Sequence, residues 1–320
     1  MPNVEKKPID FMGIRKVAAA FSIALVLGSL IILAINGLNL GLDFTGGTSV
    51  ELEYSEAPAL DDIRNVLADS GYENFVVQNF GAETSVLVRL SDAFDDELAA
   101  QVTEDLRTTG QELELVRSSF VGSQVGDELK EDSGLGLLLA LAVVLVYVAM
   151  RFQAKFGLAS VVPLAHDVII ILGIFSLFQW TFDLSVLAAL LAVIGYSLND
   201  TIVVADRIRE NFRKMRVGDS EHIINESIHQ TISRTLNTSG TTLVVLIALY
   251  LFGGEAINNF AIALIFGVIV GTYSSIYVAA SMLLALGVSR DDLVIPPKEG
   301  LVGQEGEDEE EQPPEWLNRM

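Results

Sequence analysis

The stretch LSVLAALLAVIGYSLNDTIVVA, residues 184–205, decides the fold, because it is apolar along almost its whole length and yet contains an aspartate. A membrane-spanning helix needs roughly 20 predominantly apolar residues to cross about 30 Å of hydrocarbon. Five other stretches meet or approach that length, at residues 17–37, 134–151, 157–179, 234–253 and 260–286. We therefore predict a multi-pass α-helical membrane protein with six transmembrane helices.

Composition and charge narrow the class further. Of the 320 residues, 51% are hydrophobic, and the formal net charge is nevertheless −22. Residues 38–133 hold 21 of the 42 aspartates and glutamates, and residues 290–320 hold ten more. These acidic segments must stay in water and would repel a polyanion, so we expect no nucleic acid partner. The chain has no cysteine, and no other pattern in it predicts a metal site or a cofactor.

Basic residues near the span ends predict the orientation, because lysine and arginine concentrate in cytoplasmic loops. The connections at residues 179–183 and 253–259 contain none, whereas the other ends carry Lys6, Lys7, Arg15, Lys16, Arg151, Lys155, Arg207, Arg209, Arg213, Lys214, Arg216, Arg290 and Lys298. We expect a cytoplasmic N-terminus at residues 1–16, a five-helix region at 134–289 with a cytoplasmic loop at about 206–233, and an acidic, disordered cytoplasmic tail at 290–320. At the start of that loop, we expect the amphipathic stretch 206–216 to continue the fourth span as a solvated helix at the inner surface. The apolar run at 17–37 exceeds the core of a cleaved signal peptide, so we expect it to remain as the first transmembrane helix.

Residues 38–133 would then form a periplasmic domain between the first two spans. Strand patterns occur at 48–54, 75–80, 84–90 and 113–120, and helix patterns at 59–70 and 93–109. The order strand, helix, strand, strand, helix, strand predicts a small α+β domain of the ferredoxin-like, split βαβ type. It contains no histidine, cysteine or phosphate-binding glycine loop, which favours a binding or structural module.

Asp200 is the most exceptional residue, because a charge at the centre of a span costs roughly 2.5–3.5 kcal/mol on insertion scales. It shares a helix face with Ser197, Thr201 and Val204 at i, i+3, i+4 and i+7 spacing. Arg234 begins a similar polar stripe with Asn237, Thr238 and Thr241 on the next span, and an Asp200–Arg234 contact would form a proton switch. The alternative is that cytoplasmic water solvates Asp200 at a helix end and that Arg234 marks the membrane boundary.

Two other polar features lie in the spans. His166 and Asp167 follow Pro163 in the third span, where we favour a packing or hydrogen-bonding role over a proton path. Gly267, Gly271 and Ser275 recur every four residues in the sixth span. Small residues at that spacing let helix backbones approach closely in lipid, so they predict a packing face.

Three blocks of this sequence resemble the SecF family of bacterial protein-export subunits. GLDFTGGT at residues 41–48 is similar to the glycine-glycine signature that opens the large outer loop of that family. GYSLNDTIVV at 195–204 with DRIRE at 206–210 resembles its fourth-span block, and SRTLNTS at 233–239 its fifth-span entry. Ala205 and Gly240 depart from the bulkier residues that are usual at their positions, which puts only local packing in doubt.

The resemblance implies a subunit that acts with SecD, and with a small YajC-type accessory protein, beside the SecYEG channel. It would use the proton-motive force to pull unfolded polypeptide outward across the bacterial inner membrane. Asp200, Arg234 and Asn199 would match the family's proton-pathway residues, and Asp43, Phe44, Gly46 and Gly47 would support the base of the periplasmic domain. The six spans would be half of a core related to the resistance-nodulation-division (RND) exporters.

Two other functions remain open from the residues themselves. One is a half-size RND-type exporter of small molecules or lipids, although an outer domain of about 75 residues is small for a substrate pocket. The other is a scaffold in which Asp200 and Arg234 only fix helix register. An intramembrane enzyme is disfavoured, because the spans lack a paired-aspartate, Ser–Lys, Ser–His or HExxH set.

Overall fold

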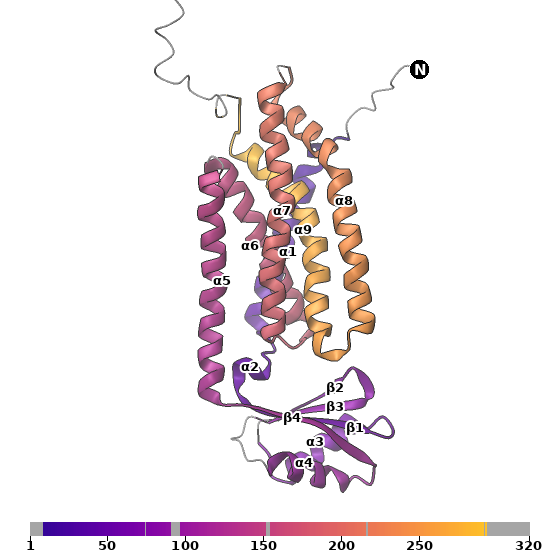
Figure 1. The fold of residues 1–320 in the computed structure, drawn as a ribbon. Coiled ribbons are helices and arrows are strands. Elements are labelled where there is room, and N and C mark those ends of the chain that lie inside the picture. The colour runs from indigo at the N-terminus through magenta and orange to yellow at the C-terminus, as the bar shows by residue number, and fades with distance from the viewer. Residues whose placement is uncertain are drawn as a thin grey trace, which may run out of the picture.

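Six long helices form a bundle above a small sheet (Figure 1). The structure, a computed structural model, describes residues 9–73, 75–90, 97–151, 154–215, 217–290 and 292. Within these ranges, six helices are long and apolar enough to cross a membrane, which confirms the predicted fold class. They are α1 (Arg15–Asn36), α5 (Ser123–Arg151), α6 (Ala154–Phe178), α7 (Leu184–Lys214), α8 (Ser220–Phe252) and α9 (Asn258–Ala285).

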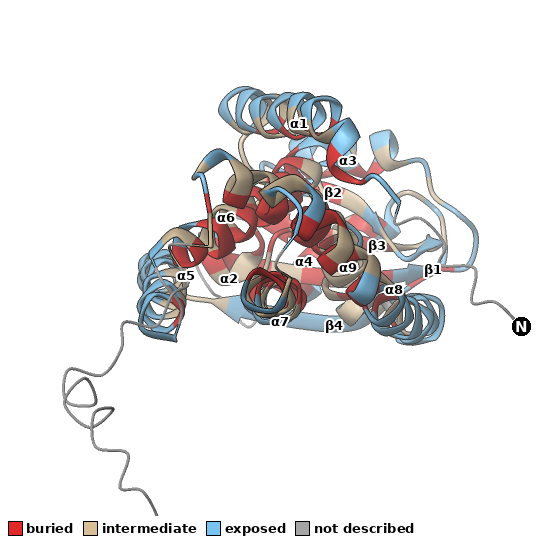
Figure 2. Ribbon diagram, turned by 90° about the horizontal axis from the view of Figure 1, so that it is seen from above, coloured by how far each residue is buried: buried red, intermediate tan, exposed pale blue. Residues whose placement is uncertain are grey.

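Helix α9 lies inside the bundle, where it packs against α6, α7, α8 and α1. Seen from above, buried residues concentrate on α6, α7 and α9, whereas α1, α5 and α8 lie at the rim with largely exposed outer faces (Figure 2). These outer faces carry large apolar side chains such as Leu138, Val143 and Val245. Hydrocarbon or another membrane helix is the environment that such faces require.

Three helices extend beyond the predicted spans. Helix α5 begins at Ser123 rather than at residue 134, and α8 begins at Ser220 rather than at 234. Helix α7 continues to Lys214, as predicted for its amphipathic extension. The predicted cytoplasmic loop at about 206–233 is therefore mostly helical. The polar extensions remain helical because side chains four residues apart pair along them, as Gln230 does with Glu226 at 2.8 Å.

The sheet domain follows the predicted element order. Its strands are β1 (Gly47–Tyr54), β2 (Phe75–Phe80), β3 (Ala82–Leu90) and β4 (Leu113–Val121), and its helices are α3 (Leu60–Asp69) and α4 (Leu98–Arg107). The strands are antiparallel in the order β2-β3-β1-β4, which is compatible with a ferredoxin-like arrangement. Helices α3 and α4 cover the face of the sheet that points away from the bundle (Figure 1). The core between these layers is built from Val50, Leu52, Tyr54, Ile63, Leu67, Val77, Val86, Val88, Leu90, Ala99, Val102, Leu106 and Leu113.

Hydrogen bonds fix the sheet domain to the loop that precedes α7. The backbone N–H of Gly41 donates to Phe182 O at 2.7 Å, and the N–H of Phe182 donates to Asn39 O at 2.8 Å. Arg89 reaches from β3 and donates to Leu40 O at 3.0 Å and to Asn39 Oδ1 at 3.3 Å. The orientation of the domain is thus set by backbone contacts directly beside the start of α7.

The glycine-glycine segment lies at this junction. Helix α2 (Leu42–Thr45) precedes it, and Phe44 is buried against Phe182 with the two ring centroids 5.9 Å apart. Gly46 has a φ of 66°, and a Cβ there would lie 2.6 Å from Ser123 Cα at the start of α5. Both the backbone conformation and the close approach therefore require glycine at residue 46.

Some predicted features fall on residues outside the described ranges. The acidic tail was predicted for 290–320, of which only residues 290 and 292 are described. The first eight residues, which carry Lys6 and Lys7, and residues 91–96 at the predicted start of the second domain helix are likewise outside these ranges.

Candidate functional site

Helix α7 positions Asp200 inside the bundle. Its buried face carries Ser197, Asp200, Thr201 and Val204, whose exposed fractions are 0%, 4%, 1% and 2%, so the predicted shared face exists. Asp183 begins the helix by accepting the N–H of Val186 at 2.9 Å. Asp43 accepts the N–H of Leu184 at 3.0 Å, which ties the same helix end to the sheet domain. The helix that carries Asp200 is thus hydrogen-bonded at its first residue to the base of the sheet domain.

Asp200 is incompletely paired. Its Oδ2 atom is buried and has no hydrogen-bond partner in the described part of the chain, and the same is true of Thr201 Oγ1. Burial of a polar atom without a partner costs free energy, and for a charged carboxylate that cost is large. The Asp200 carboxyl is therefore not fully satisfied by hydrogen bonds within the described part of this chain.

Arg234 and Asn199 lie on the exposed surface of this chain rather than against Asp200. Among the described residues no ion pair within 4.0 Å joins Asp200 to Arg234, although the charge of Arg234 acts on Asp200 electrostatically. The predicted contact between Asp200 and Arg234 is therefore not a direct ion pair, and Asn237, Thr238 and Thr241 are exposed together with Arg234. Helix α8 is rotated so that this stripe points out of the bundle.

A different face of α8 provides the buried polar contacts to its neighbours. Thr235 and Ser239 are 1% and 4% exposed. Ser239 Oγ lies 3.1 Å from Tyr196 Oη of α7 and 2.6 Å from Thr272 Oγ1 of α9. These hydroxyl contacts hold α7, α8 and α9 together at the depth of the span, where water is not present to satisfy them.

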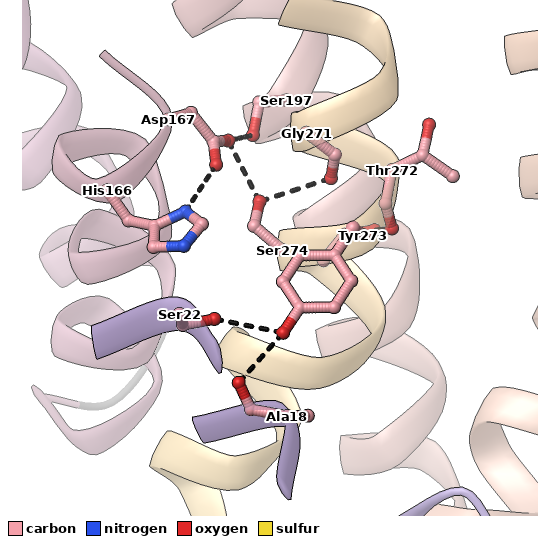
Figure 3. A network of polar contacts seen from close by, with 10 residues as sticks. Ala18, Ser22, His166, Asp167, Ser197, Gly271, Thr272, Tyr273 and Ser274 are labelled. Carbon is pink, nitrogen blue, oxygen red and sulfur yellow. Dashed lines mark hydrogen bonds and ion pairs between the residues drawn. The ribbon is translucent and has the colours of Figure 1, made fainter. Parts of the chain in front are cut away.

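The second buried carboxylate, Asp167, is fully engaged by comparison (Figure 3). It is 1% exposed. Its Oδ2 accepts the hydroxyls of Ser197 at 2.6 Å and Ser274 at 2.8 Å, and its Oδ1 lies 2.9 Å from His166 Nδ1. The carboxyl group of Asp167 on α6 therefore joins α7 and α9 through hydrogen bonds.

The contacts continue toward α1 through Tyr273. Its ring lies beside the His166 ring, with centroids 6.3 Å apart. Its hydroxyl lies 3.0 Å from Ser22 Oγ and donates to Ala18 O at 2.9 Å (Figure 3). Hydrogen-bonded groups therefore lie at both ends of the row from α7 to α1, and a ring contact between His166 and Tyr273 joins them.

The predicted small-residue face of α9 packs against α7. A Cβ on Gly267 would lie 2.1 Å from Val193 Cγ2, and a Cβ on Gly271 would lie 3.1 Å from Ser197 Cβ. Ser275 is buried and bonds to Thr272 O of its own helix. The absence of side chains at the two glycines thus lets α9 approach α7 closely beside Val193 and Ser197.

Sequence reasoning missed Ser22, Tyr273 and Ser274. Ser274 follows Gly271 by three residues, so it adjoins the small-residue stripe, but a serine in a span gives no signal of its partner on another helix. Across the described ranges, no group of three or more histidine, aspartate or glutamate side chains is placed to hold a metal ion.

Comparison with known proteins places this architecture in a family. The family model described as "Protein export membrane protein SecD/SecF, C-terminal" matches residues 101–289, and the model "SecD/SecF GG Motif" matches residues 31–58. The protein translocase subunit SecF of Vibrio alginolyticus is 49% identical over 96% of this chain and 98% of its own length. The SecF of Pseudomonas aeruginosa is 48% identical over 92% of this chain and 96% of its own length.

A solved structure agrees with these matches. The crystal structure of SecDF from Thermus thermophilus, described as a translocon-associated membrane protein, superposes with a TM-score of 0.82 at 36% identity. The match covers 90% of this chain and 40% of that longer chain. The segments matched by the two family models together span most of the helical bundle and the glycine-glycine junction. The chain belongs to the SecF family of protein translocase subunits.

Proposed function

We propose that this subunit uses the proton-motive force to promote protein export, and that Asp200 is the group that carries the proton. The single observation behind the proposal is the Asp200 carboxyl, which is 4% exposed within a membrane span and has one oxygen without a partner. Protonation removes the charge that is costly there, and release of the proton restores it. A carboxyl with two such different states can drive helix movement.

The exposed position of Arg234 and Asn199 supports a partner chain in the membrane. An arginine and an amide facing hydrocarbon would be costly, whereas a second bundle with polar groups would pair with them. We propose SecD as that partner, because the matched Thermus SecDF chain is more than twice as long as the region that this chain covers. SecD would then complete the surroundings of Asp200 from outside this chain.

The junction with the sheet domain supplies a route for movement. Because Asp43 accepts the N–H of Leu184, a shift of α7 along its axis would move the base of the sheet domain. A proton crossing a potential of 100 mV releases about 2.3 kcal/mol, enough to shift a two-state element substantially. We propose that this work moves the sheet domain against an unfolded polypeptide that leaves the SecYEG channel.

The proposed orientation follows from the basic residues. Arg151, Lys155, Arg207, Arg213 and Lys214 lie at the bundle end opposite the sheet domain. With that end in the cytoplasm of a bacterium, the sheet domain lies in the periplasm, and the inner membrane surrounds the exposed faces of α1 and α5. A YajC-type accessory protein would bind in the same membrane.

Reconstitution tests the proposal. The complex of this chain with SecD is incorporated into vesicles with SecYEG, and proton-driven export of a secretory protein is compared for wild type, Asp200→Asn and Asp206→Asn. Asp206 is the control, because it lies on the same helix but is exposed. We expect Asp200→Asn to lose proton-driven export and Asp206→Asn to retain it. Full proton-driven export by Asp200→Asn would contradict the proposal.

A further inference from the structure

Asp167 has no function in the proposal above, although it is the more deeply buried of the two intramembrane carboxyls. We propose that Asp167 and His166 form a second proton-binding site, and that Ser197 and Ser274 transmit its protonation state to α7 and α9. This inference rests on the proposed function, because it adds a second proton to the same cycle. The ligand is the proton itself, which binds to a carboxyl–imidazole pair.

Among the described residues, the groups bonded to Asp167 are two hydroxyls and an imidazole, and none of them belongs to a lysine or arginine. Helix α7 provides Ser197, and Asp200 follows one turn farther on the same face. Helix α9 provides Ser274 and Tyr273, and α1 provides Ser22 through Tyr273. Among the described residues of α5, no titratable side chain is bonded to the pair. His166 is therefore the group that can balance the charge of Asp167 within the bundle.

The hydrogen bonds suit an ionised carboxylate. The hydroxyls of Ser197 and Ser274 both donate to Oδ2, and His166 Nδ1–H donates to Oδ1. Three donors around one carboxylate replace part of the water that it lost on burial. Neither serine needs to move for this arrangement, and all of these groups already lie at hydrogen-bond distance.

The same atoms also suit a protonated carboxyl. Ser274 Oγ lies 3.2 Å from Gly271 O as well as 2.8 Å from Asp167 Oδ2. When a proton binds Oδ2, the new O–H donates to Ser274 Oγ, and the serine hydroxyl turns to donate to Gly271 O. Both protonation states are then hydrogen-bonded without displacement of a heavy atom. A carboxyl with only a structural role needs hydrogen-bond partners in one protonation state, whereas Asp167 has them in both.

His166 offers a second place for the proton. Its Nε2 atom is buried without a partner in the described part of the chain, and the residue is 6% exposed. With Nδ1–H donating to Asp167, Nε2 carries the free lone pair. A proton there makes an imidazolium beside a carboxylate, a pair with no net charge. Either position removes the uncompensated negative charge from the bundle.

Ser197 connects this site to Asp200. The two residues are three apart on the buried face of α7, so a change in the Ser197 bond acts on the helix that carries Asp200. Gly271 lets α9 approach α7 beside Ser197, because a Cβ there would lie 3.1 Å from Ser197 Cβ. The two carboxyls are thus joined by one short segment of α7.

The test compares pH profiles of proton-driven export in the reconstituted complex with SecD and SecYEG. Asp167→Asn keeps the shape of the side chain but cannot release a proton. Ser274→Ala keeps the carboxyl and removes one donor, so the remaining carboxyl holds its proton to higher pH. Ser275→Ala is the matched control, because Ser275 bonds only within its own helix in the described contacts.

We expect Asp167→Asn to flatten one limb of the profile. We expect Ser274→Ala to move the half-maximal point upward by about one pH unit, and Ser275→Ala to leave the profile unchanged. If Asp167→Asn does not fold, the Ser274→Ala shift still decides the matter. Profiles of Asp167→Asn and Ser274→Ala that match Ser275→Ala would overturn the second site alone. Full export by Asp200→Asn would instead overturn the proposed function.

Discussion

The two buried carboxyls of this bundle differ in how their oxygens are satisfied. Asp167 is bonded to groups on three helices, including its own, whereas Asp200 Oδ2 has no partner in the described chain. Both lie in spans, and Ser197 on α7 is close in sequence to one and bonded to the other. The oxygens of Asp167 thus find their hydrogen-bond partners within this subunit, whereas the buried Oδ2 of Asp200 finds none among the described residues.

The largest expected effect is on stability, when each of the two buried carboxyls is removed in turn. Asp167→Leu leaves the donors of Ser197, Ser274 and His166 without their acceptor, and we expect the free energy of unfolding to fall by about 2–4 kcal/mol. Asp200→Leu removes an atom that already lacks a partner, so we expect a change of at most about 1 kcal/mol. Denaturant unfolding of the detergent-solubilised chain measures both. Equal losses for the two variants would contradict the comparison.

The second prediction concerns the close packing of α9 against α7. Gly267→Ala places a Cβ 2.1 Å from Val193 Cγ2, and valine cannot turn away easily. We expect α7 and α9 to separate slightly, at a cost of about 1–3 kcal/mol. Gly195→Ala is the control, because a Cβ there meets nothing within 4 Å. The melting temperature of each variant checks this, and an equal decrease for both would show that close α7–α9 packing is not required.

The third prediction concerns the exposed cation. Arg234→Ala should change the stability of the isolated chain by no more than about 0.5 kcal/mol, because Arg234 is exposed in it. In the complex it should reduce the amount of SecD that co-purifies, because the partner would lose its pairing group. A large loss of stability in the isolated chain, with SecD binding unchanged, would place the role of Arg234 inside this subunit.

The smallest effect lies outside the membrane. The Lys155 ammonium donates to Asp292 at 2.8 Å and holds the pKa of that carboxyl below its usual value of 3.8. The pair therefore stabilises the protein above that ordinary pKa and ceases to do so as the pH falls through the lowered one. Both groups are partly exposed, so we expect Asp292→Asn to cost about 0.2–1 kcal/mol at pH 7. Thermal unfolding should show the two proteins converging at strongly acidic pH, and a difference that persists there would exclude the ion pair as its cause.

Much of the fold could be predicted because its signals are local. Hydropathy located the six spans, and strand and helix patterns in residues 48–120 gave the order of the domain elements. The extended ends of α5 and α8 were missed, because hydropathy marks where a span meets lipid and says nothing of a polar helix that continues into water. Asp200 could be identified from the sequence because a charged residue within an apolar segment is unusual whatever its partners are.

The site was less predictable, because its contacts join residues far apart in the chain. The contact between Asp167 and Ser274 crosses 107 positions, and serines in a span give no indication of which helix they face. Which face of α8 is turned toward the bundle also could not be predicted from the sequence. Its polar residues lie both on the stripe of Arg234 and on the face of Ser239, and only packing decides which face is buried.

Infrared difference spectroscopy of the reconstituted complex with SecD tests the central claim most directly, because the C=O vibration of a protonated carboxyl differs from that of a carboxylate. Spectra recorded across a pH titration are compared for wild type, Asp200→Asn and the exposed-site control Asp206→Asn. We predict a protonated-carboxyl band that changes with pH in wild type and in Asp206→Asn and whose Asp200 component is missing in Asp200→Asn. An identical titrating band in Asp200→Asn would show that Asp200 does not exchange a proton, and would contradict the account.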